Sequence, residues 1–329
     1  MIKKTLVGLM TVLLAVILAA GCGGGSGGSS GSGSKGEPTA KPKFPPRETT
    51  STRPVETFKI GDREGKVYAL ANFESKSYAR GSKIVVMGKS IYYHGKTPGT
   101  GKTQLVKVDY DKETLSPPVA VGESYDRGLH ILATNGKVVA YETGKGNRGF
   151  YDGKKAVEGK KFQEGAMAGG EKGGPFYMVH GVAAILTGTF SGGDFTQQKE
   201  IIKDYRRAPL RLQGAVVPVF ADEKGFYLAV DEKKSGAHEG EPTLIYLDRG
   251  GKEIRRFEGS EDQPRGWVVT ANYVIHAASK GAFRIFDRAT GAMVTELKLN
   301  MRPFDVALVK GNDVLVYDDR AKKLYRVDF

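Results

Sequence analysis

Six basic residues recur along the chain, each a few positions ahead of a short apolar run. They are Arg80, Arg127, Lys172, Arg211, Arg265 and Arg302. Cations gathered around one opening would create a positive potential there, and arginine can bind carboxylates or phosphates through two parallel hydrogen bonds. We therefore predict a candidate ring of cations that binds an anionic ligand. The alternative, and the simpler interpretation, is that each residue packs between repeats or caps a local carbonyl group.

A second motif looks like a phosphate-binding loop. Residues 96–103 read KTPGTGKT, with Lys96 where such loops place their first glycine. A phosphate loop must open a helix, because the N–H groups at the helix N-terminus hold the phosphates. Here residues 104–110 alternate between apolar and polar side chains, as in a strand. We therefore predict a hairpin loop and no nucleotide site.

The five histidines are dispersed, with no spacing typical of metal ligands. They are His94, His130, His180, His238 and His276. His130 and His276 lie on predicted strands and could face a central channel, but a buried or surface role is the simpler interpretation. No calcium-loop motif occurs, and no Ser-His-Asp arrangement can be argued from sequence alone. We predict no catalytic residue and no metal site.

The only cysteine, Cys22, cannot form a disulfide within the chain. It follows a positive start and an apolar run over residues 6–20, which is short for a bilayer span but suits a signal-peptide core. Residues 18–22, LAAGC, resemble the lipobox of bacterial lipoproteins, with Ala19 where leucine is usual. The resemblance implies cleavage before Cys22 and acylation of its thiol. The alternative is an ordinary cleaved signal followed by a chance cysteine.

Lipidation would anchor the protein to a membrane, because several acyl chains together hold a protein stably. In a Gram-negative cell, Gly23 after the cysteine would permit sorting to the outer membrane. The residues that follow are rich in Gly and Ser and then, up to residue 54, in Pro and Lys, a composition typical of an extended tether. We predict a signal peptide over 1–21, a lipidated tether over 22–54 and one folded domain over 55–329.

The folded part is built on an internal repeat. Apolar runs recur about every 44 residues, which is the length of a four-stranded propeller blade. These first runs begin at Ile84, Leu129, Phe176, Val217, Trp267 and Phe304. Each is followed by a turn that contains Gly or Asn, and then by a second apolar run, which is the pattern of a β-hairpin.

In most repeats a third run ends near an aspartate, as at Asp109, Asp152, Asp248 and Asp287. We expect these carboxylates to cap turns by accepting backbone N–H groups. Residues 287–291, DRATG, resemble the repeats of quinoprotein (PQQ-like) propellers. The cofactor-binding members of that class use repeated tryptophans, whereas this chain has only Trp267. We therefore expect no quinone and no other cofactor.

These patterns predict an all-β fold, a single β-propeller of four-stranded blades. Six blades are expected, with seven as the alternative because two candidate strands precede the first clear repeat. The last repeat reaches Phe329 after only three runs. Residues 57–60 or 67–71 could supply the missing strand, since propellers commonly close by pairing strands from both termini.

The net charge of +13 indicates a basic surface, which is either a solvated surface or a means of attracting anions. Together the features favour a monomeric, membrane-anchored, extracytoplasmic module that binds without catalysis. Its partner would be an envelope protein or an anionic glycan or lipid, and no nucleic acid is expected. The alternative is an extracellular enzyme acting on a carbohydrate or lactone, with residues from several blades converging in the central channel.

Overall fold

The structure is a computed structural model. Its described residues are 53–73, 83–96, 102–111, 114–124, 132–143, 147–159, 166–181, 183–191, 194–232, 241–259 and 264–329. Cys22 and the tether up to residue 52, Arg80, Arg127, His130 and His238 lie outside them. The predicted lipidation and two of the six candidate cations therefore stay predictions.

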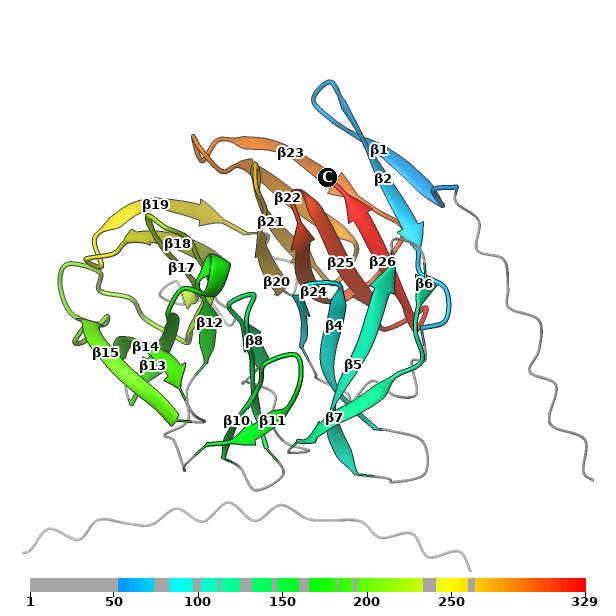
Figure 1. Ribbon diagram of the computed structural model, residues 1–329. Coiled ribbons are helices and arrows are strands. Elements are labelled where there is room, and N and C mark those ends of the chain that lie inside the picture. The colour runs from blue at the N-terminus through cyan, green and yellow to red at the C-terminus, as the bar shows by residue number, and fades with distance from the viewer. Residues whose placement is uncertain are drawn as a thin grey trace, which may run out of the picture. The chain divides into compact units, whose positions relative to one another are not determined.

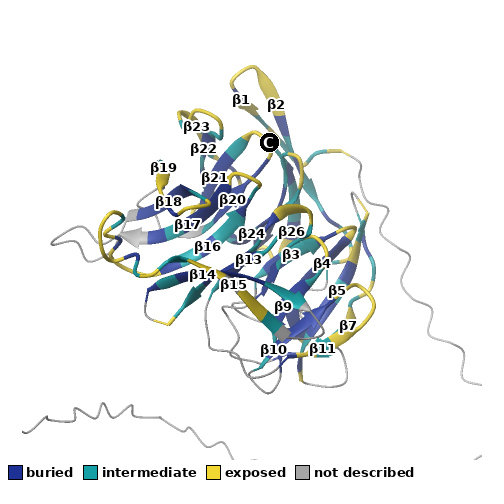
Figure 2. Ribbon diagram, turned by 60° about the vertical axis from the view of Figure 1, so that its left-hand side comes forward, coloured by how far each residue is buried: buried dark blue, intermediate teal, exposed yellow. Residues whose placement is uncertain are grey.

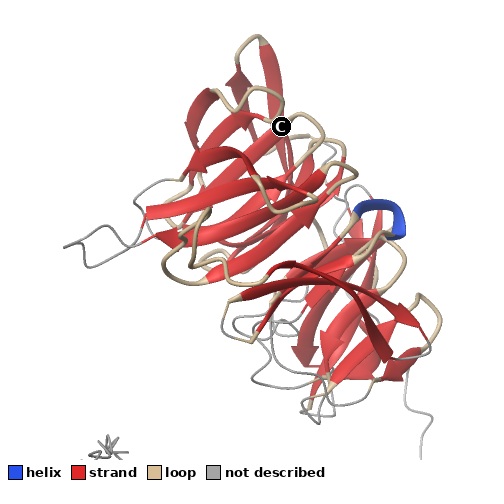
Figure 3. Cartoon of the chain, turned by 90° about the vertical axis from the view of Figure 1, so that its left-hand side faces the viewer, coloured by secondary structure: helices blue, strands red, loops and turns tan. Residues whose placement is uncertain are grey.

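Strands dominate this part of the chain, and its one helical segment is the short 3₁₀ helix η2 (Glu171–Gly173) (Figure 3). None of the described residues form a helix with the length and apolar character of a bilayer span. The strands form six antiparallel sheets, each a blade of a ring (Figure 1). Blade 1 consists of β3 (Ile84–Met87), β4 (Ser90–Lys96), β5 (Thr103–Asp111), β6 (Thr114–Leu115) and β7 (Val119–Glu123). Blade 2 consists of β8 (Leu132–Thr134), β9 (Val139–Glu142), β10 (Arg148–Tyr151) and β11 (Ala156–Glu158).

The next three blades repeat this plan of consecutive strands. Blade 3 consists of β12 (Met167–Gly169), β13 (Phe176–His180), β14 (Ala184–Ser191) and β15 (Asp194–Ile202). Blade 4 consists of β16 (Val216–Ala221), β17 (Gly225–Glu232), β18 (Glu241–Asp248) and β19 (Glu253–Glu258). Blade 5 consists of β20 (Pro264–Val269), β21 (Tyr273–Ala278), β22 (Ala282–Asp287) and β23 (Met293–Lys298).

Blade 6 joins the two ends of the folded domain. Its strands β24 (Pro303–Lys310), β25 (Asp313–Asp318) and β26 (Lys323–Asp328) come from the C-terminus. The N-terminal strand β2 (Arg63–Ala69) pairs antiparallel with β26, and β1 (Glu56–Ile60) adds a fifth strand beyond it. The predicted closure is confirmed, and six blades replace the alternative of seven because the two early strands complete the last blade.

The first strand of each blade lies on the inside of the ring. Neighbouring inner strands contact one another in the closed order β3, β8, β12, β16, β20, β24 and back to β3. A parallel bridge between Gly170 and Ala221 shows that β12 and β16 run in the same direction. At Gly169 an added Cβ would overlap the carbonyl oxygen of Thr134, so only glycine allows this approach of β12 to β8.

Apolar packing between blades holds the ring together. Among the described residues, the buried apolar side chains form six clusters, and each cluster spans the junction of two successive blades. Figure 2 shows this burial in the middle strands, while exposed residues gather on turns and outer strands. A sheet whose two faces are both covered reads as a continuous apolar run rather than an alternating one. This explains why β4, β21 and β25 are buried along almost their whole length.

In blade 3 the prediction of the first strand was wrong, because it took the second strand for the first. Phe176 begins the second strand, β13, and the inner strand is β12, only three residues of small and flexible side chains. The longer aromatic run of β13 gives the stronger apolar signal although it lies further from the axis. In blade 2 the inner strand is described over Leu132–Thr134, and Leu129 lies outside the described residues.

Three of the four predicted aspartates cap turns. The Asp152 carboxylate accepts the N–H groups of Lys154 and Lys155, each at 2.9 Å. Asp287 accepts the hydroxyl and the N–H of Thr290, and Asp248 accepts the N–H groups of Gly250 and Lys252. Because these bonds stabilise the ionised form, they hold the pKa of all three carboxyl groups below the usual value.

Asp109 is the exception, because β5 continues past it to Asp111. Its carboxylate accepts the Ser90 hydroxyl at 2.7 Å and pairs with Lys107 at 2.9 Å. The prediction of a turn cap was wrong here, because the strand continues beyond the apolar run that ends at Val108.

The predicted hairpin in place of a phosphate loop is confirmed. Lys96 at the end of β4 pairs with Thr103 at the start of β5, and the two strands are antiparallel. Residues 97–101 lie outside the described residues. The segment after the loop is therefore a strand, and it offers no helix N-terminus to a phosphate.

Candidate functional site

The six inner strands surround a cavity of about 670 Å³. A cavity of this size suits a small organic ligand, because such sites usually measure about 300–1,000 Å³. Every inner strand contributes to the wall, from β3 around the ring to β24. The position follows from the fold, since the inner strands of the ring surround its axis.

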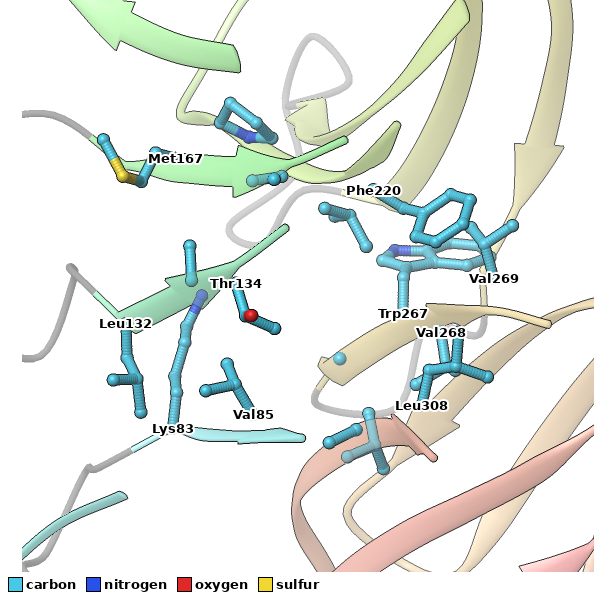
Figure 4. Close-up of a pocket in the computed structure, with 18 of the residues that line it drawn as sticks. Lys83, Val85, Leu132, Thr134, Met167, Phe220, Trp267, Val268, Val269 and Leu308 are labelled. Carbon is cyan, nitrogen blue, oxygen red and sulfur yellow. The ribbon is translucent and has the colours of Figure 1, made fainter. Parts of the chain in front are cut away.

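Most of the wall is apolar. Val85, Leu132, Met167 and Leu308 extend from four different inner strands in the close-up view of Figure 4. Side chains of an inner strand alternate between the two faces of its sheet, toward the two neighbouring blades, so consecutive residues such as those of 266–269 and 305–309 line the wall. The central part of the cavity is therefore a surface that favours an apolar molecule over water.

Trp267 is the largest side chain of the wall and lies on β20. It is buried, and its ring centroid lies 4.5 Å from that of His276. Phe220 of the neighbouring blade packs against the same apolar cluster. The two rings lie together on one side of the cavity in Figure 4. They form a rigid aromatic part of the wall.

Two charged residues lie at the junction of blades 6 and 1. The Asp305 carboxyl of β24 accepts the N–H of Ile84 at the start of β3, which ties one inner strand to the next. Burial raises the pKa of Asp305 to about 7, and the positive charge of Lys83 opposes that rise. Figure 4 shows the Lys83 side chain extending from the start of β3 toward Thr134. The cavity wall therefore carries both an ammonium group and a carboxyl whose pKa burial raises to about 7.

An ion pair lies at the other end of the cavity wall, next to the turns. Lys172 of η2 donates to the Glu223 carboxylate at 3.0 Å and so links blade 3 to the turn between β16 and β17. The two side chains are 78% and 74% exposed. Pairs so exposed contribute little to stability because water and salt screen them. Among the described residues, Lys172 and Glu171 are the charged members of the wall at this end.

His276 lies on the second strand of blade 5, where it packs against Trp267. Burial lowers its pKa to about 4, so the imidazole is neutral at physiological pH. It is not among the described residues of the cavity wall, although the sequence allowed for a place there. Over the part of the chain that the structure describes, no three His, Cys, Asp or Glu side chains gather as metal ligands would.

Comparison with known proteins supports the architecture. No known family model matches the chain, and no curated protein matches it. Among solved structures, the RRP9 WD40 repeats superpose with a TM-score of 0.52 at 8% identity, covering 80% of this chain and 97% of that chain. The chain is a six-bladed β-propeller.

Two further solved structures superpose on this propeller with lower TM-scores than RRP9 does. The WD40 β-propeller domain of Doa1 gives a TM-score of 0.45 at 11% identity and covers 79% of this chain and 96% of that chain. U3-55K gives 0.46 at 10% identity and covers 77% of each chain. Identities this low concern the fold of the propeller alone.

The structure places four of the six predicted cations. Lys172 follows its inner strand instead of preceding it, because Phe176 begins the second strand of blade 3. The prediction that it stands with the others ahead of a first strand was wrong. Arg211, Arg265 and Arg302 do come before or at the start of inner strands β16, β20 and β24. Since inner strands run in one direction, Lys172 lies at the opposite end of the ring from these three.

The three described arginines of this set differ in their surroundings. Arg302 pairs with Asp319 at 3.3 Å, and its backbone N–H donates to Asp318. Arg211 is exposed in the connection between blades 3 and 4, with a left-handed backbone at φ 53°. For Arg265 only the backbone is described. Lys172 is therefore no member of the predicted ring, which stays a prediction for the other five cations, with Arg80 and Arg127 outside the described residues.

The sequence contained signals for the charged residues of the cavity. Lys83 stands directly ahead of the first apolar run, nearer to it than Arg80. Asp305 interrupts the apolar run that begins at Phe304. A carboxylate inside a buried strand is costly and therefore points to a specific partner. Only the closed ring brings these two residues, far apart in the chain, to one place.

Proposed function

We propose that the protein is a membrane-anchored, extracytoplasmic lipoprotein whose propeller is a non-catalytic binding module. The observation that carries the proposal is the central cavity, which has an apolar wall contributed by all six blades. A wall of this kind favours binding, whereas catalysis of hydrolysis requires titratable groups that converge on a reacting bond. The partner would be an anionic ligand or another protein of the envelope.

The position of the titratable residues argues against the alternative of an enzyme for carbohydrates or lactones. The acidic residues of the described wall are Asp305 and Glu171. Asp305 lies near the start of its inner strand, and Glu171 follows the end of another. Since inner strands run in the same direction, these carboxyl groups lie at opposite ends of the ring. Paired carboxylates that act on a glycosidic bond must lie within about 10 Å of each other.

The anchor is proposed from the sequence at Cys22. The signal-peptide core and the residues LAAGC imply a lipid on this thiol. The Gly, Ser and Pro composition of residues 22–54 would then let the propeller stand away from the membrane. A binding module at the end of such a tether can meet partners at a range of distances from the bilayer.

The anchor is tested by growing cells with an alkyne analogue of palmitate. We expect label on the full chain, recovery of the protein in the membrane fraction, and loss of both in a Cys22→Ala variant. Cys22 is the only cysteine, so no other thiol of the chain can take the label. Equal membrane recovery of the variant, without label on the wild type, would contradict the anchor.

The binding role is tested by pull-down from solubilised envelope with the lipidated protein, beside an assay of lactone and glycoside hydrolysis. We expect specific capture that the cavity-filling variant Val85→Phe abolishes, and no hydrolysis above that of heat-denatured protein. Val119→Phe, on an outer strand, is the matched control and should capture as the wild type does. Capture of the lipid-modifying enzymes alone would remove the support for a binding module. Hydrolysis that Val85→Phe abolishes would instead support the enzyme.

A further inference from the structure

We propose that the central cavity binds a small amphiphile, a molecule with an apolar body and a single carboxylate. The proposal deepens the proposed binding function and rests on it by naming the class of ligand. Three observations carry it: the size of the cavity, its apolar wall and the place of Lys83.

The size and the lining specify the body of the ligand. A volume of about 670 Å³ exceeds that of a metal ion, an inorganic phosphate or a single sugar. Val85, Leu132 and Leu308 offer aliphatic contacts, and Trp267 and Phe220 offer aromatic ones (Figure 4). Burial of an apolar body against this wall removes its surface from water, which favours binding. A sugar or nucleotide would instead lose hydrogen bonds to water that the apolar wall cannot replace.

The charge of Lys83 specifies the head group. Its side chain extends into the cavity from the start of β3 (Figure 4). An ammonium group next to an apolar wall attracts an anion more strongly than one in bulk water, because the local dielectric constant is lower. A ligand carboxylate could therefore reach Lys83 while its body lies against Trp267 and Phe220. A cationic ligand would face repulsion from the same ammonium group.

Asp305 and the apolar wall together favour a head group with one charge. The positive charge of Lys83 acts on the Asp305 carboxyl, which accepts the Ile84 N–H. An incoming carboxylate must share Lys83 with Asp305, and the two anions repel when both are ionised. A dianionic head group such as a phosphate monoester would meet about twice that repulsion and about twice the attraction of Lys83. It would also cost more to remove from water beside the apolar wall, so a single carboxylate is the anion that this part of the wall accommodates best.

The chain carries its own reporter of binding, because Trp267 is its only tryptophan. The full chain in phosphatidylcholine nanodiscs is titrated with dansylaminoundecanoic acid, with empty nanodiscs as the blank. Energy transfer from Trp267 to the dansyl group then reports a probe within the propeller. We expect saturable transfer with the acid and an affinity at least tenfold lower for its methyl ester.

Two variants, each with a matched control, locate the bound probe. Lys83→Met should lower affinity for the acid about tenfold and leave affinity for the ester unchanged. Lys89→Met, at an exposed lysine after the same strand, should change neither. Val85→Phe should lower affinity for both probes at least tenfold, whereas Val119→Phe, where the side chain is 57% exposed, should change neither.

Displacement identifies the body of the ligand. Dodecanoate displaces the probe if the site prefers an alkyl chain, and naphthoate displaces it if the site prefers aromatic rings. Failure of both, or unchanged affinity in Val85→Phe and Lys83→Met with circular dichroism like that of wild type, overturns the proposal. If the titration shows no binding of the probe while Cys22 takes the label and envelope partners are captured, the carboxylate ligand is wrong and the proposed function stands. If the titration shows binding while Cys22 takes no label and the pull-down captures nothing, the proposed function is wrong and the ligand stands.

Discussion

Two junctions of the ring place an aspartate near a cation, and they differ in what surrounds the charges. Between blades 4 and 5, Asp222 and Arg288 form an ion pair of 2.7 Å on the turns outside the cavity. Between blades 6 and 1, Asp305 lies in an inner strand near Lys83 at the cavity wall. The first pair is embedded in polar and aromatic groups, whereas the second adjoins the space where a ligand would lie.

All three nitrogen atoms of the Arg288 guanidinium group donate hydrogen bonds. It donates to the carbonyl oxygen of Thr270 at 2.7 Å, to the Tyr227 hydroxyl at 3.3 Å and to Asp222. It also lies over the Phe220 ring at 5.4 Å. A buried ion pair stabilises a fold only when such hydrogen bonds satisfy the rest of both groups. This junction therefore has the properties of a structural contact between blades.

The Asp305 junction is built differently. A backbone N–H of the neighbouring strand is donated to the carboxyl, and burial raises its pKa to about 7. The charge of this group can therefore change within the physiological pH range, while that of a guanidinium group cannot. An aspartate and a cation on the turns between blades thus form a structural contact, whereas Asp305 and Lys83 place charge at the wall of the cavity.

The strongest destabilisation should come from breaking the structural pair. Arg288→Met leaves the largely buried Asp222 without its cation and should lower the free energy of unfolding by about 3–5 kcal/mol. Urea unfolding at neutral pH measures the change. The control is Arg256→Met, whose ion pair with Glu253 is about one-third exposed on both sides and should contribute about 0–1 kcal/mol. Equal losses in the two variants would show that the Arg288 pair is no more than a surface contact.

A smaller and pH-dependent change should appear at Asp305. Because its folded pKa is raised from 3.8 to about 7, the folded state keeps a proton that the unfolded state releases between these values. Its contribution to stability is therefore full below the unfolded value and is lost as pH rises through 7, by on the order of 3 kcal/mol between pH 4.5 and pH 8. Asp305→Asn keeps an oxygen that can accept the Ile84 N–H but has no carboxyl group to titrate. The difference in urea stability, variant minus wild type, should grow over this range; a constant difference would contradict the raised pKa.

The exposed pair between blades 3 and 4 should contribute least. Lys172→Met removes a charge that water already screens, so the midpoint of urea unfolding should stay within the error of the measurement. Raising the salt concentration should change the wild type and the variant alike. A clear loss of stability in this variant would place Lys172 among the structural contacts with Arg288.

Much of the fold could be predicted from the sequence because its determinants are local. Hairpin turns with Gly or Asn, apolar runs and turn-capping aspartates each act over a few residues. Blade 3 was misplaced because the short inner strand of Met167, Ala168 and Gly169 carries a weaker apolar signal than the aromatic second strand.

The site could be predicted only in part, because its residues come together through contacts between blades. Lys83 and Asp305 are near each other only after the ring closes, and no periodicity in the sequence relates them. Position ahead of an apolar run predicts Arg80 as the cation of the first blade, although Lys83 lies closer to that run and lines the cavity. The apolar cavity wall was not predicted at all, since the same side chains would suit a solid core.

Closure of blade 6 also bears on how the chain folds during synthesis. Val67 of β2 pairs with Val327 of β26, so this pairing joins the earliest and the latest parts of the domain. Contacts of such long sequence separation form slowly, because the intervening chain must first be ordered. Until then β2 has an open edge to which other chains could add. Arg63, Glu64 and Lys66 line this strand with charge, and such charges disfavour pairing with another chain while the C-terminus is still being made.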